Sequence, residues 1–232
     1  MTDWLFAPPA TPTIAIDGVD EAYPVRRIFC VGRNYVAHAI EMGVAVDREA
    51  PFYFTKSAHA ICPSGTTVAY PPGTENYHYE MELVVAVGAE VYQISPEQAP
   101  AAVYAYGCGL DMTRRDLQLA AREKQRPWDL GKDFEDSAVM APFALAAQFG
   151  EPGPQRIQLK VNGEVRQDAH IADLIWSVPE LVSHLSGYYH LGPGDLIMTG
   201  TPAGVGPLVP GDKVEGSIDR LAPVALTIGA AQ

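Results

Sequence analysis

Cysteine is scarce in this chain of 232 residues. Cys30, Cys62 and Cys108 are the three present, they are widely spaced, and no Cys-x-x-Cys pair occurs. An odd number of distant cysteines argues against a disulfide framework, and the missing pair argues against a thiolate zinc site. The sequence therefore predicts a protein of a reducing compartment, and we expect the cytoplasm.

Positive charge and long apolar runs are also in short supply. Lys and Arg number 16 against 28 Asp and Glu, a formal net charge of −12. No basic stripe could neutralise a row of phosphates, which argues against a nucleic-acid partner. No run of about 18 apolar residues suits a membrane span, and the N-terminus lacks the basic and apolar regions of a signal peptide. An anionic substrate would need local cations to reverse the overall field.

Apolar residues and turn formers are plentiful. Hydrophobic residues make up 47% of the chain, and 21 Gly and 20 Pro are spread along it. A chain of this length can bury a sizeable core, and frequent turns favour short strands. We expect a β-dominated α+β protein with short peripheral helices. We expect a Pro-punctuated extension over residues 1–24, followed by one domain over residues 25–232.

Local patterns place the elements. Strands are expected at 13–16, 25–31, 52–55, 66–70, 79–87, 104–111, 196–199, 213–218 and 224–228. Asn162-Gly163 between expected strands at 157–161 and 164–167 predicts a type I′ hairpin. Helices are expected from Asn34 as N-cap to Gly43, and after the capping signals at Ser95 (to about 104), Thr113 (to about 124) and Ser177 (to about 186).

Glu80-Met81-Glu82 is the first candidate site. In a strand, residues i and i+2 project from one face about 6.5–7 Å apart, so these two carboxylates favour a hard cation between them. Asp111, at the end of an apolar segment and before a helix, is the candidate third ligand. A solvated strand face and a helix-flanking aspartate are the alternative interpretations. Since no His-x-His pattern supports zinc, a carboxylate-only set indicates Mg²⁺ or Mn²⁺.

Three further segments offer catalytic groups. His38 and Glu41 lie three residues apart on a predicted helix, where a carboxylate that holds one imidazole nitrogen leaves the other free as a base. An exposed helical pair is the alternative. Lys132 follows Gly131 in an acidic loop and is either a surface lysine or the missing local cation. The Gly-rich bend around Thr201 offers hydroxyls and N–H groups to a carboxylate.

Six segments together resemble the fumarylacetoacetate hydrolase family: VGRNYVAHAIEMG, YEMELVVAVG, GLDMTRRDLQ, GKDFEDSA, LKVNGEVRQD and GDLIMTGTPAGVG. They occur in order between about residues 25 and 229. The resemblance implies a mixed β-roll, a homodimer, and Mg²⁺ or Mn²⁺ on Glu80, Glu82 and Asp111. It also implies a water-activating His38–Glu41 pair on a lid helix and a catalytic Lys132. The positions that would bind substrate or order the site are Arg33, Arg115, Gln118, Thr201 and, with them, Lys56.

The resemblance also implies an activity. Family members of this kind hydrolyse a carbon–carbon bond of an acylpyruvate, and the segments FAPPATPTIAIDGVDEAYPVRRIFCVGRNY and PFYFTKSAHAI are most similar to bacterial fumarylpyruvate hydrolases of gentisate breakdown. The expected products are fumarate and pyruvate. Alternatives on the same scaffold are an oxaloacetate decarboxylase and a 2-hydroxyalkadienoate hydratase or isomerase; a non-enzymatic anion-binding β-domain is another. Arg33, Lys56 and Arg115 are equal candidates for the cation that faces the distal carboxylate.

Overall fold

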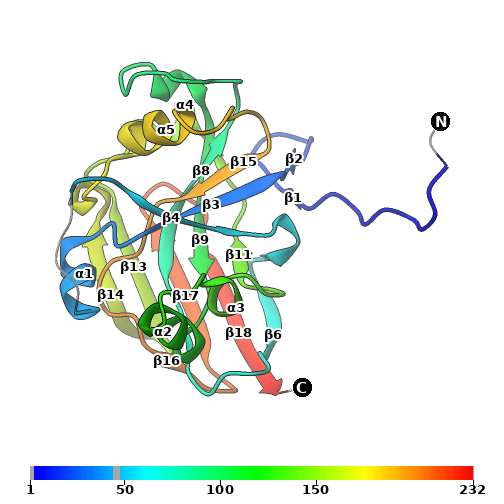
Figure 1. Ribbon diagram of the computed structural model, residues 1–232, viewed down its shortest axis with the longest axis vertical. Coiled ribbons are helices and arrows are strands. Elements are labelled where there is room, and N and C mark those ends of the chain that lie inside the picture. Colours follow the sequence, from blue (N-terminus) through cyan, green and yellow to red (C-terminus); the bar gives the residue numbers. More distant parts are fainter. Residues whose placement is uncertain (1–2, 44–47, 232) are drawn as a thin grey trace.

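Two curved β-sheets form the body of the computed structural model, which describes residues 3–43 and 48–231 (Figure 1). The larger sheet has the strand order β4 (Phe52–Lys56), β3 (Arg27–Gly32), β15 (Asp195–Met198), β8 (Met81–Val87), β9 (Val103–Asp111), β11 (Ala138–Met140) and β5 (Ile61–Pro63), with β12 (Ala144–Leu145) also paired to β9. The second sheet has the order β14 (Glu164–His170), β13 (Arg156–Val161), β17 (Lys213–Ile218), β18 (Val224–Ala231) and β6 (Thr66–Tyr70). The pairs β3–β15, β5–β11 and β6–β18 are parallel and the others in these two sheets are antiparallel. The predicted β-dominated mixed architecture is confirmed.

The remaining elements are short and lie around these sheets (Figure 1). Two small sheets consist of β10 (Thr113–Arg114), β7 (Tyr77–His78) and β16 (Pro207–Leu208), and of β1 (Thr13–Ile14) and β2 (Tyr23–Pro24). The helices are α1 (Val36–Glu41), α2 (Arg115–Glu123), α3 (Asp129–Lys132), α4 (Ala146–Phe149) and α5 (Val178–Ser186), with 3₁₀ turns at Ala58–Ala60, Ala99–Ala102 and Ile171–Asp173. Over residues 3–43 and 48–231, no helix is long and apolar enough to cross a bilayer.

Both faces of the larger sheet are buried, and this decides where polar groups can lie. All seven residues of β8 are buried. Leu83 and Val85 pack into the main core, whereas Val84 and Ala86 pack into a second apolar cluster on the opposite face. Because side chains alternate along a strand, Glu82 projects on the same face as Val84. The apolar layer on that face therefore gives way to carboxylates where β8 begins.

Glycines in β9 make room for this second cluster. A Cβ at Gly107 would lie 1.9 Å from Cδ1 of Phe143, and a Cβ at Gly109 would lie 2.6 Å from Cγ2 of Val84. Asp111 follows at the next position of the same parity, so the alternation brings its carboxylate to the same face. The string Gly-x-Gly-x-Asp thus combines close packing with one polar group at the end of the strand.

The N-terminal segment contacts the larger sheet through residues 13–24. Ile14 and Tyr23 are buried in the second cluster, and the Tyr23 hydroxyl donates to the carbonyls of Val87 (2.7 Å) and Asp195 (3.1 Å). The buried Asp195 carboxylate in turn accepts hydrogen bonds from Arg26 and Arg27, at 2.7–3.1 Å. Residues 3–8 extend away from the body (Figure 1). The division of the chain at residue 24 stays a prediction.

Most expected elements are present, but three expected helix starts are wrong. Thr113 lies in β10, and α2 begins at Arg115 with Arg114 as its N-cap. Asn34 does not cap α1, because its side-chain amide donates to the carbonyls of Trp176 (2.9 Å) and Thr199 (2.8 Å). The helix expected after Ser95 is a single 3₁₀ turn at Ala99–Ala102, because the chain joins β9 already at Val103. By contrast, Asn162 (φ 52°) and Gly163 (φ 83°) form the expected tight turn between β13 and β14.

Candidate active site

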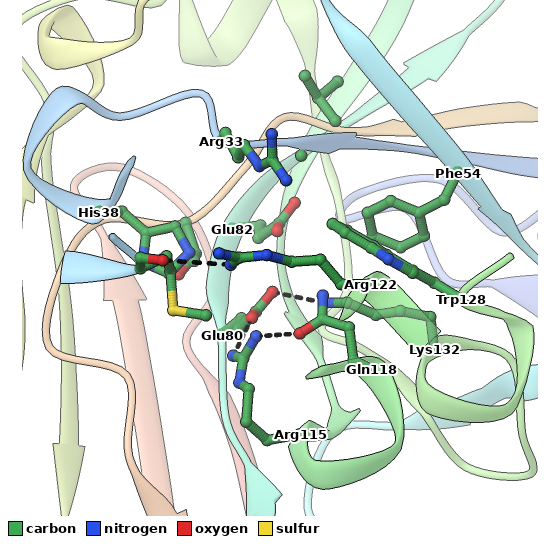
Figure 2. Close-up of a pocket in the computed structure, with 14 residues that line it drawn as sticks. Arg33, His38, Phe54, Glu80, Glu82, Arg115, Gln118, Arg122, Trp128 and Lys132 are labelled. Atoms are coloured by element: carbon green, nitrogen blue, oxygen red, sulfur yellow. Dashed lines mark hydrogen bonds and ion pairs between the residues drawn. The ribbon is translucent and has the colours of Figure 1, made fainter. Parts of the chain in front are cut away.

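A cavity opens where the acidic ends of β8 and β9 meet helices α1, α2 and α3 (Figure 2). The space between its lining atoms amounts to about 460 Å³, part of it open to solvent. The cavity brings together eight of the residues predicted from the sequence: Arg33, His38, Glu80, Glu82, Arg115, Gln118, Lys132 and Thr201. Glu41, Asp111 and Lys56 lie behind these residues and contact them.

Glu80, Glu82 and Asp111 converge on one point. One carboxylate oxygen from each lies within 4.8 Å of the other two, and the three side chains are at most 6% exposed. Three buried carboxylates at this spacing repel one another. Burial, reinforced by the charges of Asp111 and Glu80, raises the pKa of Glu82 well above its usual range. Oxygen ligands at this separation are a donor set for Mg²⁺ or Mn²⁺.

Two buried lysines support the cluster from behind. The ammonium group of Lys132 donates to Glu80 Oε2, Asp111 Oδ2 and Thr113 Oγ1, each at 2.7 Å. That of Lys56 donates to the carbonyls of Lys132 and Met112 and to Ser137 Oγ. Burial opposes the charge on Lys132, but the neighbouring Asp111 and Glu80 outweigh it and raise its pKa. Both ammonium groups therefore have their three donors satisfied.

The geometry of Asp111 tests whether a cation fits. Its Oδ1 is fully buried and accepts no hydrogen bond among the described residues, although Lys56 Nζ lies 2.9 Å away. That ammonium group has three other acceptors, so it pairs with Oδ1 by charge and leaves a lone pair of the carboxylate open to a further cation. A buried acceptor in this state is costly unless something positive completes it. The donor set therefore fits a divalent cation.

His38 faces the cavity from α1 and is oriented from behind. Its Nδ1 lies 3.0 Å from Glu41 Oε2, and the other Glu41 oxygen accepts the N–H of Gly204 at 3.0 Å. An ionised carboxylate can only accept, so Nδ1 carries the proton and Nε2 is left as the basic nitrogen. The imidazole is thereby a base held in place by a carboxylate, itself anchored to the Gly-rich loop.

Gln167 on β14 is a supporting residue that the sequence did not reveal. It is fully buried, accepts the N–H of Met81 at 3.0 Å, and donates to Thr201 Oγ1 (2.8 Å) and the carbonyl of Pro202 (2.7 Å). It therefore joins the start of β8 to the Thr201 loop. The same loop donates the N–H of Gly200 to Glu82 Oε2 at 2.8 Å. A glutamine alone on a strand carries no local signal of this role.

One face of α2 lines the cavity. Arg115 donates to Glu80 Oε1 and to the side-chain oxygen of Gln118. Burial alone would raise the pKa of Glu80. The positive charges of Lys132 and, next, of Arg115 outweigh burial and hold that pKa well below its usual range. Arg122, which the sequence analysis did not select, follows on the same face and donates to the carbonyl of Met42 at 3.2 Å. Arg115, Gln118 and Arg122 follow one another at intervals of three and four residues, which puts them on one helix face. This spacing was the signal in the sequence that could have identified Arg122.

Several known proteins are similar to this chain. Residues 27–229 match the family model described as fumarylacetoacetate (FAA) hydrolase C-terminal. Fumarylpyruvate hydrolase from a Ralstonia species is 52% identical over 194 residues, 82% of this chain and 100% of that protein. An oxaloacetate tautomerase from Escherichia coli is 39% identical over 198 residues, 85% of this chain and 90% of that protein.

A solved structure extends the likeness to three dimensions. Fumarylpyruvate hydrolase from Pseudomonas aeruginosa, in complex with Mn²⁺ and pyruvate, matches with a TM-score of 0.95 at 50% identity, covering 98% of this chain and 100% of that chain. The carboxylate cluster of the present chain is suited to the same kind of ion. On both the family match and these identities, the chain belongs to the fumarylacetoacetate hydrolase family.

Proposed function

We propose that this protein is a metal-dependent carbon–carbon hydrolase of acylpyruvates, and that it converts 3-fumarylpyruvate and water to fumarate and pyruvate. One observation carries the proposal: the carboxylates of Glu80, Glu82 and Asp111 and the Glu41-oriented base His38 belong to one cavity. Relatives named fumarylpyruvate hydrolase, at 50–52% identity, support the substrate. We place the reaction in gentisate degradation.

The three carboxylates would hold Mg²⁺ or Mn²⁺, which supplies positive charge to the pyruvyl end of the substrate as it leaves. His38 Nε2 takes a proton from water, whose oxygen bonds to the distal keto carbon. Glu41 keeps Nδ1 protonated and stabilises the imidazolium that forms. Since Gly204 fixes the second Glu41 oxygen, the base is positioned before the substrate arrives.

Cleavage then breaks the bond between the distal keto carbon and the adjacent methylene carbon. The electron pair passes to the methylene carbon and onto the keto oxygen of the pyruvyl group, and a proton returned to the methylene carbon completes pyruvate. Lys132, at 2.7 Å from both Glu80 and Asp111, keeps these ligands fixed and places a cation beside the developing charge. Arg115 and Gln118 face the same end and orient the substrate.

The His38–Glu41 pair favours hydrolysis over decarboxylation, which needs the cation but no base that activates water. A hydratase-type relative or a tautomerase of oxaloacetate also needs a base to move a proton, so the substrate, not this pair, separates hydrolysis from those two reactions. A non-enzymatic anion-binding domain would need neither the cation nor the base. The proposal therefore assigns Thr201 to substrate binding beside that pair, and Lys56, which lies behind Asp111, to ordering the site.

The test is pyruvate release from fumarylpyruvate, acetylpyruvate and oxaloacetate, measured on protein stripped by EDTA and then supplied with Mg²⁺ or Mn²⁺. We expect cleavage of fumarylpyruvate that requires the added ion and falls about 10²–10⁴-fold in kcat for His38→Ala. Oxaloacetate turned over far faster than both acylpyruvates would refute the proposed reaction.

The proposal extends to assembly and location. The N-terminal residues Trp4, Leu5 and Phe6 are 68–89% exposed on a segment that extends away from the body (Figure 1), an apolar surface suited to a second copy of the chain in a homodimer. Light scattering on the full chain tests this. Three cysteines, all free and buried, are consistent with a reducing cytoplasm.

A further inference from the structure

We infer that Arg33 and Arg122 together bind the distal carboxylate of the substrate and make the enzyme selective for dicarboxylic acylpyruvates. The inference rests on the proposed function and deepens it. A fumaryl group carries a second negative charge at the end remote from the pyruvyl group, so a cation of the cavity must face it. The sequence offered three equal candidates for that cation, and the structure separates them.

Two of the three candidates are already committed to the carboxylate cluster. Lys56 is 3% exposed, does not line the cavity, and gives its protons to two backbone carbonyls and Ser137. Arg115 is paired with Glu80 and Gln118. Redirecting either side chain to a substrate would leave a buried acceptor without its donor, which is costly, above all for a charged group.

Arg33 has no such commitment. It lines the cavity, and its guanidinium carbon lies over the rings of Phe52 (5.6 Å) and Trp128 (5.9 Å). Over residues 3–43 and 48–231 it makes no hydrogen bond to another side chain or to the backbone. Stacking on two aromatic rings fixes the plane of the guanidinium while its N–H edge stays open. That edge is available to a planar carboxylate.

The backbone of Arg33 also indicates a specialised position. Its φ of 62° lies in the left-handed region, which is uncommon for a residue with a side chain. This bend is the corner between β3 and α1, and it turns the side chain into the cavity beside Val31 and Gly32. A glycine would adopt the bend at less cost, so this corner accepts backbone strain to place a long cationic side chain in the cavity.

Arg122 approaches the same space from the opposite side. Figure 2 shows it reaching from α2 across the cavity toward the side of His38, with Arg33 on the side of Glu82 remote from Arg115. One of its N–H groups binds the Met42 carbonyl at 3.2 Å, and among the described residues no carboxylate pairs with it. Burial and the nearby charge of Arg122 both lower the pKa of Arg33. Two guanidinium groups that repel each other in one cavity favour an anion between them.

The arrangement divides the cavity by charge. Lys132 and Arg115 are paired with carboxylates of the cluster, whereas among the described residues no carboxylate pairs with Arg33 or Arg122. A carboxylate held by two guanidinium groups accepts up to four N–H bonds in a fixed plane. We therefore expect selectivity against acylpyruvates whose acyl group is uncharged, such as acetylpyruvate.

The experiment compares kcat/KM for fumarylpyruvate with that for acetylpyruvate in Arg122→Gln, Arg33→Gln and the unaltered enzyme loaded with Mn²⁺. We expect the ratio to fall about 10- to 100-fold in each variant, through a higher KM for fumarylpyruvate, as for loss of a charged hydrogen bond. Lys124→Gln is the matched control: it removes an equal charge two residues from Arg122 on an exposed side chain, and the ratio should stay constant.

Three outcomes overturn the inference. An equal loss of kcat on both substrates in Arg122→Gln would mean that Arg122 acts by holding α1, and with it His38, through the Met42 carbonyl. Unaltered enzyme with no preference for fumarylpyruvate over acetylpyruvate would refute the selectivity while leaving acylpyruvate hydrolysis intact. Failure to cleave any acylpyruvate would instead refute the proposed function, and the inference with it.

Discussion

Replacing Glu82 by Gln separates the stability of the cluster from its function. The substitution keeps the shape of the side chain and an acceptor for the N–H of Gly200, and it removes one of three mutually repelling charges. Without metal, we expect the free energy of unfolding of the variant to equal that of the original protein or to exceed it by up to about 2 kcal/mol. The reason is that charge clusters that serve function commonly cost stability. With Mn²⁺ present, the original protein should be more stable than the variant.

The magnitude of that reversal follows from linkage. A ligand at 100 times its Kd stabilises the folded state by about 2.7 kcal/mol, and 1 kcal/mol shifts Tm by about 2–4 °C at this chain length. Mn²⁺ should therefore raise the Tm of the original protein by about 5–10 °C. Loss of one of three ligand groups should reduce the shift in Glu82→Gln to less than about 3 °C at the same concentration.

The pH dependence has a definite sign. The pKa of Glu82 is raised in the folded state by burial and by Asp111 and Glu80, so its ionisation opposes folding as pH rises above the unfolded value of about 4.3. The advantage of the metal-free variant should therefore be larger at pH 8 than at pH 5.

Differential scanning fluorimetry of EDTA-stripped protein, titrated with Mn²⁺, measures both effects. Glu215→Gln, which neutralises an exposed glutamate on β17, is the control for the loss of one negative charge. An undiminished Mn²⁺ shift in Glu82→Gln would show that Glu82 is not a ligand. A metal-free variant that melts several degrees below the original would show that the repulsion argument is wrong.

Three other perturbations test the framework of the site. Asp195→Asn should cost about 2–3 kcal/mol at pH 7 in urea unfolding, because the buried carboxylate accepts charged hydrogen bonds that hold its pKa low against the effect of burial. This stability is present above the unfolded pKa near 3.9 and is lost as pH falls through the folded value, so the difference should shrink at pH 3. Gly107→Ala should lower stability by about 1–3 kcal/mol, since its Cβ would lie 1.9 Å from the Phe143 ring, and a Phe143→Leu background should reduce that cost in thermal unfolding. Glu41→Gln should lower kcat about 10²-fold with little change in KM, because His38 loses the charge that stabilises its protonated form; an unchanged kcat would remove Glu41 from the mechanism.

The sequence predicts the parts of the site that depend on local periodicity. Glu80 and Glu82 share a face because a strand alternates, and His38 and Glu41 meet because a helix repeats every 3.6 residues. Both pairs lie as expected. Asp111 was placed at the end of a strand by the apolar run before it, and that strand is β9.

Other parts depend on tertiary contacts that no local pattern contains. Gln167 joins β14 to two distant segments, and Asn34 bonds to Trp176 and Thr199 instead of capping the helix that follows it. Ser95 has a good capping pattern, but the nearby start of β9 leaves no room for a helix. In each case, a side chain with several possible partners is decided by strands that arrive from elsewhere in the chain.

The distribution of charge answers the question that composition raised. The chain carries −12 overall, yet Lys56, Lys132, Arg115, Arg33 and Arg122, five of its 16 basic residues, lie in or directly behind one cavity. Lys56, Lys132 and Arg115 offset the negative charges of the three carboxylates that would bind a divalent cation. The bound cation would therefore add two positive charges to a cluster that is neutral without it. Arg33 and Arg122, which line the same cavity, add two further positive charges. A dianionic substrate therefore meets a positive cavity in an acidic protein, and since buried charges are screened less than surface ones, this local field outweighs the more distant negative surface.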